Sequence, residues 1–79
     1  MAVVSDLTAS WSSGTTLSAD EVWQCHAGEV LVATGPTAPA SDVDGIALFA
    51  PDSVKISSGK TVYYKLADTA TTVLTRTEV

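Results

Sequence analysis

β-Branched residues set the limits on what this chain can fold into. Threonine occurs 11 times and valine ten times in 79 residues, and both side chains are stiff at χ1 and pack well on a pleated surface. No stretch repeats apolar residues at the three- to four-residue spacing of an amphipathic helix. The sequence therefore predicts an all-β fold, a small single-domain β-sandwich or barrel of about six to seven short strands over residues 1–79.

Two segments alternate in hydrophobicity on both sides of a turn signal. In the segment from Val54 to Leu66 the turn is Ser57-Ser58-Gly59-Lys60, and in the segment from Glu21 to Thr34 it is Ala27-Gly28. Two alternating runs joined by a short turn containing glycine are typical of antiparallel neighbours. We expect each segment to form a β-hairpin.

A stretch rich in proline separates these two segments. Pro36 and Pro39 lie within residues 35–45 and donate no backbone hydrogen bonds. The stretch therefore predicts a long surface loop, and loops of this length often make contacts outside their own domain. We expect a short strand from Ile46 to Phe49 after the loop, and a final strand over residues 71–77.

The single cysteine limits how the fold can be stabilised. Cys25 is the only cysteine, which excludes an internal disulfide, and a zinc site needs several ligands at set spacing. No phosphate-binding loop or other cofactor motif is present, so we expect no cofactor and no metal. A chain this short buries only about 60% of its unfolded surface, which favours stabilisation by association with other chains.

Two short motifs resemble functional sites, one catalytic and one calcium-binding, but each lacks a feature that such a site requires. Cys25 and His26 are adjacent, but neighbours on a strand point to opposite faces, so the imidazole is badly placed to activate the thiol. Asp42-Val43-Asp44-Gly45 resembles the start of a calcium loop, yet the later ligand positions fall on Ile46 and Ser53, which carry no carboxylate. We therefore expect a non-enzymatic protein, with a turn at residues 42–45.

The charge balance argues against two classes of partner. Four Lys and Arg stand against nine Asp and Glu, for a net charge of -5. Binding to a phosphate backbone or to an anionic membrane surface needs clustered cations, and Lys55, Lys60, Lys65 and Arg76 are spread along the second half of the chain. We expect no nucleic acid and no membrane among the partners, and a protein made and used in the cytoplasm or in something assembled there.

Five aromatic side chains could fill a core or form a binding surface. They are Trp11, Trp23, Phe49, Tyr63 and Tyr64. Because the two tyrosines are adjacent, at most one of them faces the core. We interpret Trp23, Phe49 and one tyrosine as core residues. An exposed set that stacks on sugar rings is the alternative.

Residues 22–79 contain a series of short segments in a set order. The segments are Val22-Trp23-Gln24-Cys25, Val30-Leu31-Val32-Ala33, Ala38-Pro39-Ala40, Asp44-Gly45-Ile46, Pro51-Asp52-Ser53-Val54 and Gly59-Lys60-Thr61-Val62-Tyr63-Tyr64. They indicate a strand and its partner, an Ala-Pro loop, a short strand, a turn, and a strand with an aromatic pair. In this order residues 22–79 resemble small virion proteins of tailed bacteriophages. At the turn, Asp52 stands where such proteins usually have glycine.

The resemblance implies a capsid decoration (cement) protein on the virion surface, commonly a homotrimer, that binds the major capsid protein and is assembled in the host cytoplasm. A tail or head-tail connector component is one alternative, and a carbohydrate-binding surface module is another. The segments with least internal periodicity are the predicted N-terminal arm, residues 1–11, and the loop, residues 35–45. We predict that they contact the capsid or a neighbouring subunit. The predicted contact residues are Ala2, Val3, Val4, Leu7, Trp11, Pro36 and Pro39.

Overall fold

The described part of the chain is made of short strands without helices. The structure is a computed structural model that describes residues 2–40, 45–67 and 71–79. Its eight strands are β1 (Ala2–Val3), β2 (Thr15–Thr16), β3 (Glu21–Ala27), β4 (Glu29–Thr34), β5 (Ile46–Phe49), β6 (Ser53–Ile56), β7 (Thr61–Leu66) and β8 (Val73–Glu78). The prediction of a small all-β domain is confirmed, with one strand more than expected.

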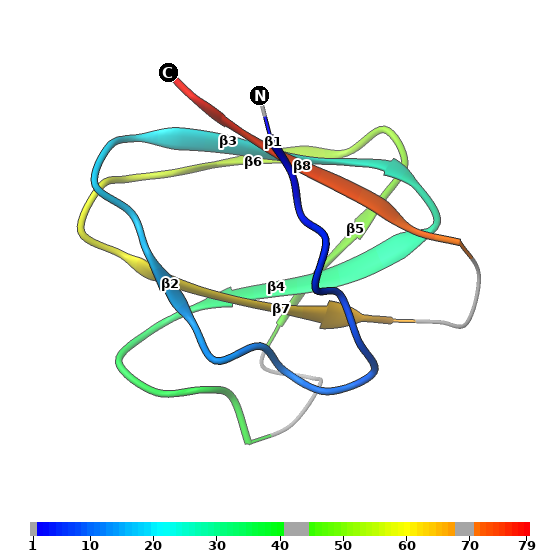
Figure 1. Cartoon of the computed structure of the whole chain (residues 1–79), viewed down its shortest axis with the longest axis horizontal. Helices are drawn as coiled ribbons and strands as arrows, with labels where there is room; N and C mark the ends of the chain where they lie inside the picture. The colour runs from blue at the N-terminus through cyan, green and yellow to red at the C-terminus, as the bar shows by residue number, and fades with distance from the viewer. Residues whose placement is uncertain (1, 41–44, 68–70) are drawn as a thin grey trace.

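The strands form two four-stranded antiparallel sheets that face each other as a sandwich (Figure 1). The strand order is β1-β8-β3-β6 in sheet A and β2-β7-β4-β5 in sheet B. Only the step from β4 to β5 stays within one sheet, because every other pair of consecutive strands lies in opposite sheets. The chain therefore crosses between the layers at almost every turn.

This crossing overturns both predicted hairpins. β3 pairs with β6 and β8, whereas β4 pairs with β5 and β7. The bend at Ala27-Gly28 and the turn at residues 57–60 lie where the sequence indicated them, but each joins the two sheets. Gly28 has φ +72°, and a Cβ there would lie 2.5 Å from the Thr72 hydroxyl oxygen. Alternation and a glycine turn fit a corner between sheets as well as a hairpin, so the pattern could not separate them.

The core lies between the sheets and is centred on Trp23, which is fully buried. The Trp23 and Tyr64 rings pack with their centroids 5.6 Å apart. The buried core residues are Leu17, Trp23, Cys25, Val30, Val32, Leu48, Ile56, Val62, Tyr64 and Leu74. Phe49 is not among them, since it is 55% exposed. Its assignment to the core was wrong, because Phe49 follows the core-facing Leu48 and so points to the other face of β5.

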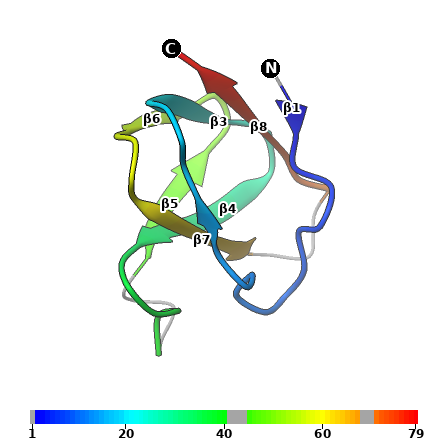
Figure 2. The same ribbon diagram turned by 60° about the vertical axis from the view of Figure 1, so that its left-hand side comes forward.

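The N-terminal segment, residues 2–17, runs along one side of the sandwich (Figure 2). β1 pairs with β8, and the Val4 amide donates to the Leu74 carbonyl at 2.8 Å. Val4 and Leu7 pack against the core, and the Tyr64 hydroxyl donates to Asp6 Oδ1 at 2.8 Å. The structure therefore uses this segment to cover its own core.

The same segment also covers part of the outer face of sheet B. The Trp11 ring lies against Gly45, where an added Cβ would be 2.8 Å from Trp11 Cη2. Gly14 lies against the Tyr63 ring, and Tyr63 and Leu31 are both buried although their neighbours Tyr64 and Val32 are the residues that face the core. One tyrosine faces the core, as predicted, and the other is buried beneath the N-terminal segment.

Candidate functional site

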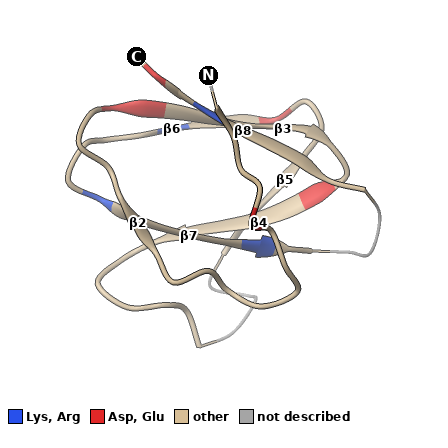
Figure 3. Ribbon diagram, in the orientation of Figure 1, with Lys and Arg blue, Asp and Glu red and all other residues tan. Residues whose placement is uncertain are grey.

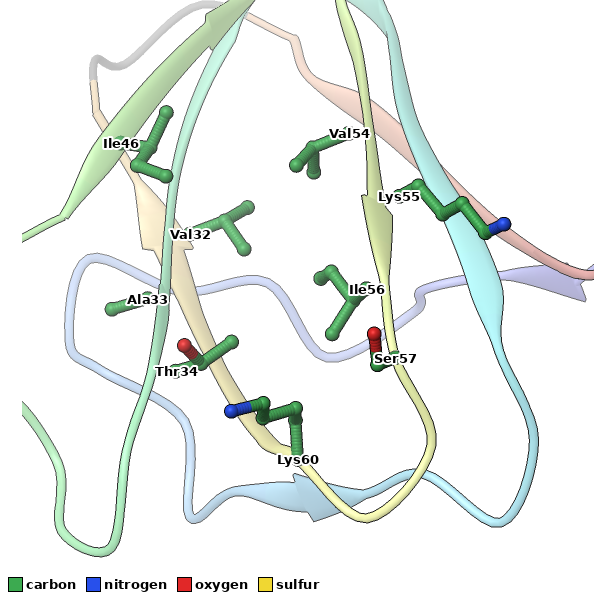
Figure 4. Close-up of a pocket in the computed structure, with 9 residues that line it drawn as sticks. All are labelled: Val32, Ala33, Thr34, Ile46, Val54, Lys55, Ile56, Ser57 and Lys60. Atoms are coloured by element: carbon green, nitrogen blue, oxygen red, sulfur yellow. The ribbon is translucent and has the colours of Figure 1, made fainter.

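The side of the sandwich opposite the N-terminal segment carries a groove of about 260 Å³ between the two sheets. Figure 4 shows Val32 and Ile46 of sheet B on one wall and Val54 and Ile56 of sheet A on the other. Ala33, Thr34, Lys55, Ser57 and Lys60 complete the lining. We call this feature the β5–β6 groove, because these two strands are the edges between which it opens.

Ile46 shows that the groove is a part of the inner face of sheet B that sheet A does not cover. Ile46 pairs with Val32, and Leu48 pairs with Val30, so both β5 side chains belong to the inner face of sheet B. Leu48 is 4% exposed, whereas Ile46 is 58% exposed. The inner face of sheet B therefore extends beyond the part that sheet A covers.

The free edge of β6 borders the groove. The Cys25 amide donates to the Asp52 carbonyl at 3.0 Å, and the register places Trp23 opposite Val54 and Glu21 opposite Ile56. Because hydrogen-bonded pairs alternate along an antiparallel ladder, the backbone groups of Val54 and Ile56 point toward β3. Those of the intervening residues, Ser53 and Lys55, therefore point outward. Within the described residues these outward amides and carbonyls have no partner strand, so this edge is a template for another strand.

The edge of β5 is less available than that of β6. The Phe49 amide donates to Asp52 Oδ2 at 3.2 Å, and the Phe49 carbonyl accepts from the Asp52 amide at 2.6 Å. The short turn after β5 thus uses the outward backbone groups at the end of the strand. Ala47 is the residue of β5 whose outward groups remain.

Two of the four cations of the chain lie at the groove. The Lys60 side chain reaches across one end of the groove toward Thr34, whereas the Lys55 amine points away from it (Figure 4). Within the described residues, neither lysine forms an ion pair. The acidic chain thus presents a cationic end to this apolar groove, and Figure 3 shows a blue segment in β6 and another just before β7, both on the left of the view.

The described part of the chain has one ion pair with a buried partner, and it lies away from the groove. Arg76 donates through Nε and Nη2 to Glu21 Oε1 and Oε2 at 2.8 and 2.7 Å. Glu21 is buried, and the guanidinium lies 5.1 Å from the centre of the Trp23 ring. The hydrogen bonds to Glu21 raise the pKa of Arg76. This pair closes one end of the core, and no sequence pattern indicated it because the partners lie 55 positions apart.

Cys25 and His26 do not form a catalytic pair in this geometry. Cys25 is fully buried, and its thiol donates to the Ala27 carbonyl at 3.3 Å. Burial raises the pKa of the thiol above 9.0, and the bond to Ala27 partly offsets this. His26 is exposed at a bulge in β3, and its Nε2 is hydrogen-bonded to the Thr75 hydroxyl at 2.8 Å. The expected separation of the two side chains is confirmed.

The predicted contact residues do not gather at one place. Ala2 and Val3 are exposed on β1, an edge of sheet A, whereas Val4, Leu7 and Trp11 are partly buried.

Of the two prolines, Pro36 lines a shallow hollow with Lys60, next to the β5–β6 groove, and Pro39 is partly buried. Contact between any of the predicted residues and a partner stays a prediction. The groove itself was missed, because its existence depends on which strands end up as sheet edges.

The calcium-like motif lies outside the described residues, apart from Gly45. In the described ranges, no three His, Cys, Asp or Glu side chains gather in a way that could hold a metal ion. Those ranges also include no helix long and apolar enough to cross a membrane.

Comparison with known proteins finds no match among family models, curated proteins or solved structures. The function of the chain is therefore inferred from its own residues and geometry.

Proposed function

We propose that this chain is a non-enzymatic virion structural protein of a tailed bacteriophage, a capsid decoration protein that binds the major capsid protein and stabilises the shell. The observation that carries the proposal is the β5–β6 groove, an apolar opening on one side of a very small domain. Isolated apolar groups on a surface are common, whereas a groove that exposes core side chains offers a partner a continuous apolar surface. A decoration protein needs such a site.

The sequence resemblance to small phage virion proteins supports the phage setting. Its segments include the strands that build the groove, among them Val30-Leu31-Val32-Ala33 and Pro51-Asp52-Ser53-Val54. The outward polar residues of sheet A, such as Gln24 and Thr77, suit a surface that remains in water after the groove has docked. We further propose that the assembled form is a homotrimer, since a core of this size gains from a shared interface.

Of the alternatives, a tail or connector component uses the same kind of docking surface and differs in copy number. The carbohydrate-binding alternative needs an exposed set of aromatic rings, and of the five aromatic residues only Phe49 is more than half exposed. Tyr63 is buried beneath the N-terminal segment and Trp11 is partly buried against Gly45, so neither ring presents an open face for stacking on a sugar. A single exposed ring does not make the set of aromatic residues that this alternative needs.

The copy number of the chain in purified virions tests the proposal. For the phage or prophage that encodes the chain, quantitative mass spectrometry should find it in a fixed ratio to the major capsid protein. Particles that lack it should release DNA at a lower temperature. A few copies per particle would favour the tail or connector alternative, and absence from virions would overturn the proposal.

A further inference from the structure

The β5–β6 groove has the dimensions and the lining of a site for a strand. Its volume of about 260 Å³ is below the ~300–1,000 Å³ of pockets that enclose drug-sized ligands. Its sheet A wall presents Val54 and Ile56, two residues apart on β6, so apolar positions repeat at the period of an extended chain. Side chains at alternate positions of a strand could fill the groove, whereas a compact ligand would remain largely exposed.

The backbone of β6 supplies the second requirement. Ser53 and Lys55 direct their amides and carbonyls away from β3, and both residues are exposed. An extended segment that adds to a sheet edge gains affinity from main-chain hydrogen bonds and specificity from pockets for its alternate side chains. β6 provides the main-chain hydrogen bonds, and the groove beside it provides the pockets for alternate side chains.

The charge at the groove indicates the chemistry of the occupant. Lys60 reaches across one end, in a chain whose net charge is -5. Within the described residues Lys60 forms no ion pair, so a carboxylate on an incoming segment would pair with it.

We propose that the β5–β6 groove binds one extended segment of another protein, which adds to the free edge of β6, places alternate apolar side chains against Val54, Ile56 and Ile46, and brings a carboxylate to Lys60. The inference rests on the proposed function, since it describes how the chain attaches to a capsid protein. It assigns the attachment to a segment donated by the partner.

A display selection tests the site without any phage component. The full chain is immobilised and presented with random peptides of about nine residues, the length of a long strand. Enriched peptides should share apolar residues at alternate positions and an Asp or Glu toward one end. Their affinities are then measured by fluorescence anisotropy.

Matched variants locate the binding. Ile46→Glu and Lys60→Glu should each weaken peptide binding by about tenfold or more, because each opposes the segment within the groove. Phe49→Glu and Lys65→Glu are the controls. Phe49 is nearly as exposed as Ile46 on the same strand but points to the other face, and the Lys65 amine lies over the Trp11 ring, on the side of the N-terminal segment and away from the groove. Each control should change the affinity by less than about threefold.

Two results would overturn the inference. One is a selection without enrichment, or with peptides that bind the groove variants as well as the original chain. The other is an oligomer that Ile46→Glu dissociates in sedimentation, since the groove would then hold a second copy. Failure of the proposed function is seen separately, because a groove that binds peptides in a chain absent from virions would disprove only the capsid role.

Discussion

The two long sides of this sandwich differ in whether the apolar residues between the sheets are covered. On one side, residues 2–17 leave sheet A, cover the core with Val4 and Leu7, and pass over the outer face of sheet B with Trp11. On the other side, β5 and β6 are joined by a short turn and leave Ile46 and Phe49 more than half exposed. The same chain therefore buries a segment of low periodicity and exposes one of its most apolar strands.

The difference separates a side that stabilises the isolated domain from a side that leaves apolar side chains in water. On the covered side each layer depends on the N-terminal segment, through hydrogen bonds to β8 and β7 and through packing on the core. On the open side, Ile46 adds little to the isolated domain because most of its surface stays in water. Mutations on the two sides should therefore separate stability from binding.

The largest expected effect is on the covered side. Removal of residues 1–7 eliminates the β1–β8 pairing, the packing of Val4 and Leu7, and the hydrogen bond from Tyr64 to Asp6. We expect the free energy of unfolding to fall by about 4 kcal/mol, which is most of the stability of a domain this small. Urea denaturation followed by tryptophan fluorescence measures it. A truncated chain with an unchanged midpoint would show that the segment is a dispensable arm.

Two aromatic residues give a direct comparison of the sides. Trp11→Ala removes the ring that packs on Gly45 and should cost about 2 kcal/mol. Phe49→Ala removes an exposed ring on the open side and should change stability by less than about 0.5 kcal/mol. Paired thermal and urea unfolding measures both. Equal costs for the two variants would contradict the assignment of covered and open sides.

A smaller effect is expected from the hydroxyl of Tyr64. Tyr64→Phe loses the hydrogen bond to Asp6 and should cost about 1 kcal/mol at neutral pH. Burial, followed by the contact with Asp6, raises the pKa of Tyr64 above 10.0. A pKa that folding raises contributes stability that is fully present below pH 10 and is lost as the pH rises through the folded value.

The pH dependence of unfolding checks this assignment. The parent chain should lose stability above pH 10 more steeply than the Tyr64→Phe variant. Cys25, whose pKa is raised above 9.0 by burial, acts in the same direction from a lower pH in both chains. Parallel curves for the two chains above pH 10 would show that Tyr64 does not carry the effect.

The sequence predicted local features of the fold better than the pairing of strands. The strand from Ile46 to Phe49 and the bend at Ala27-Gly28 follow from alternation and turn residues, and the structure has both. The pairing of the strands was predicted wrongly because a turn between two alternating runs has the same sequence pattern whether it joins neighbouring strands or strands of opposite sheets. The groove could not be predicted for the same reason. The alternating pattern predicts Ile46 as an ordinary core residue, and only the strand order shows that β5 lies at an edge.

The smallest expected effect concerns Ile46 itself. Ile46→Thr keeps the β-branched shape and removes apolar surface from a side chain that is 58% exposed, so the isolated domain should change in stability by less than about 0.5 kcal/mol. Leu48→Ala, two residues along the same inner face, should cost about 3 kcal/mol because Leu48 is buried. Unfolding of both variants is measured at two protein concentrations. If Ile46→Thr costs more than about 1 kcal/mol and the cost grows with concentration, another copy of the chain already covers this side in solution, and the groove is then not free to receive a segment of a different protein.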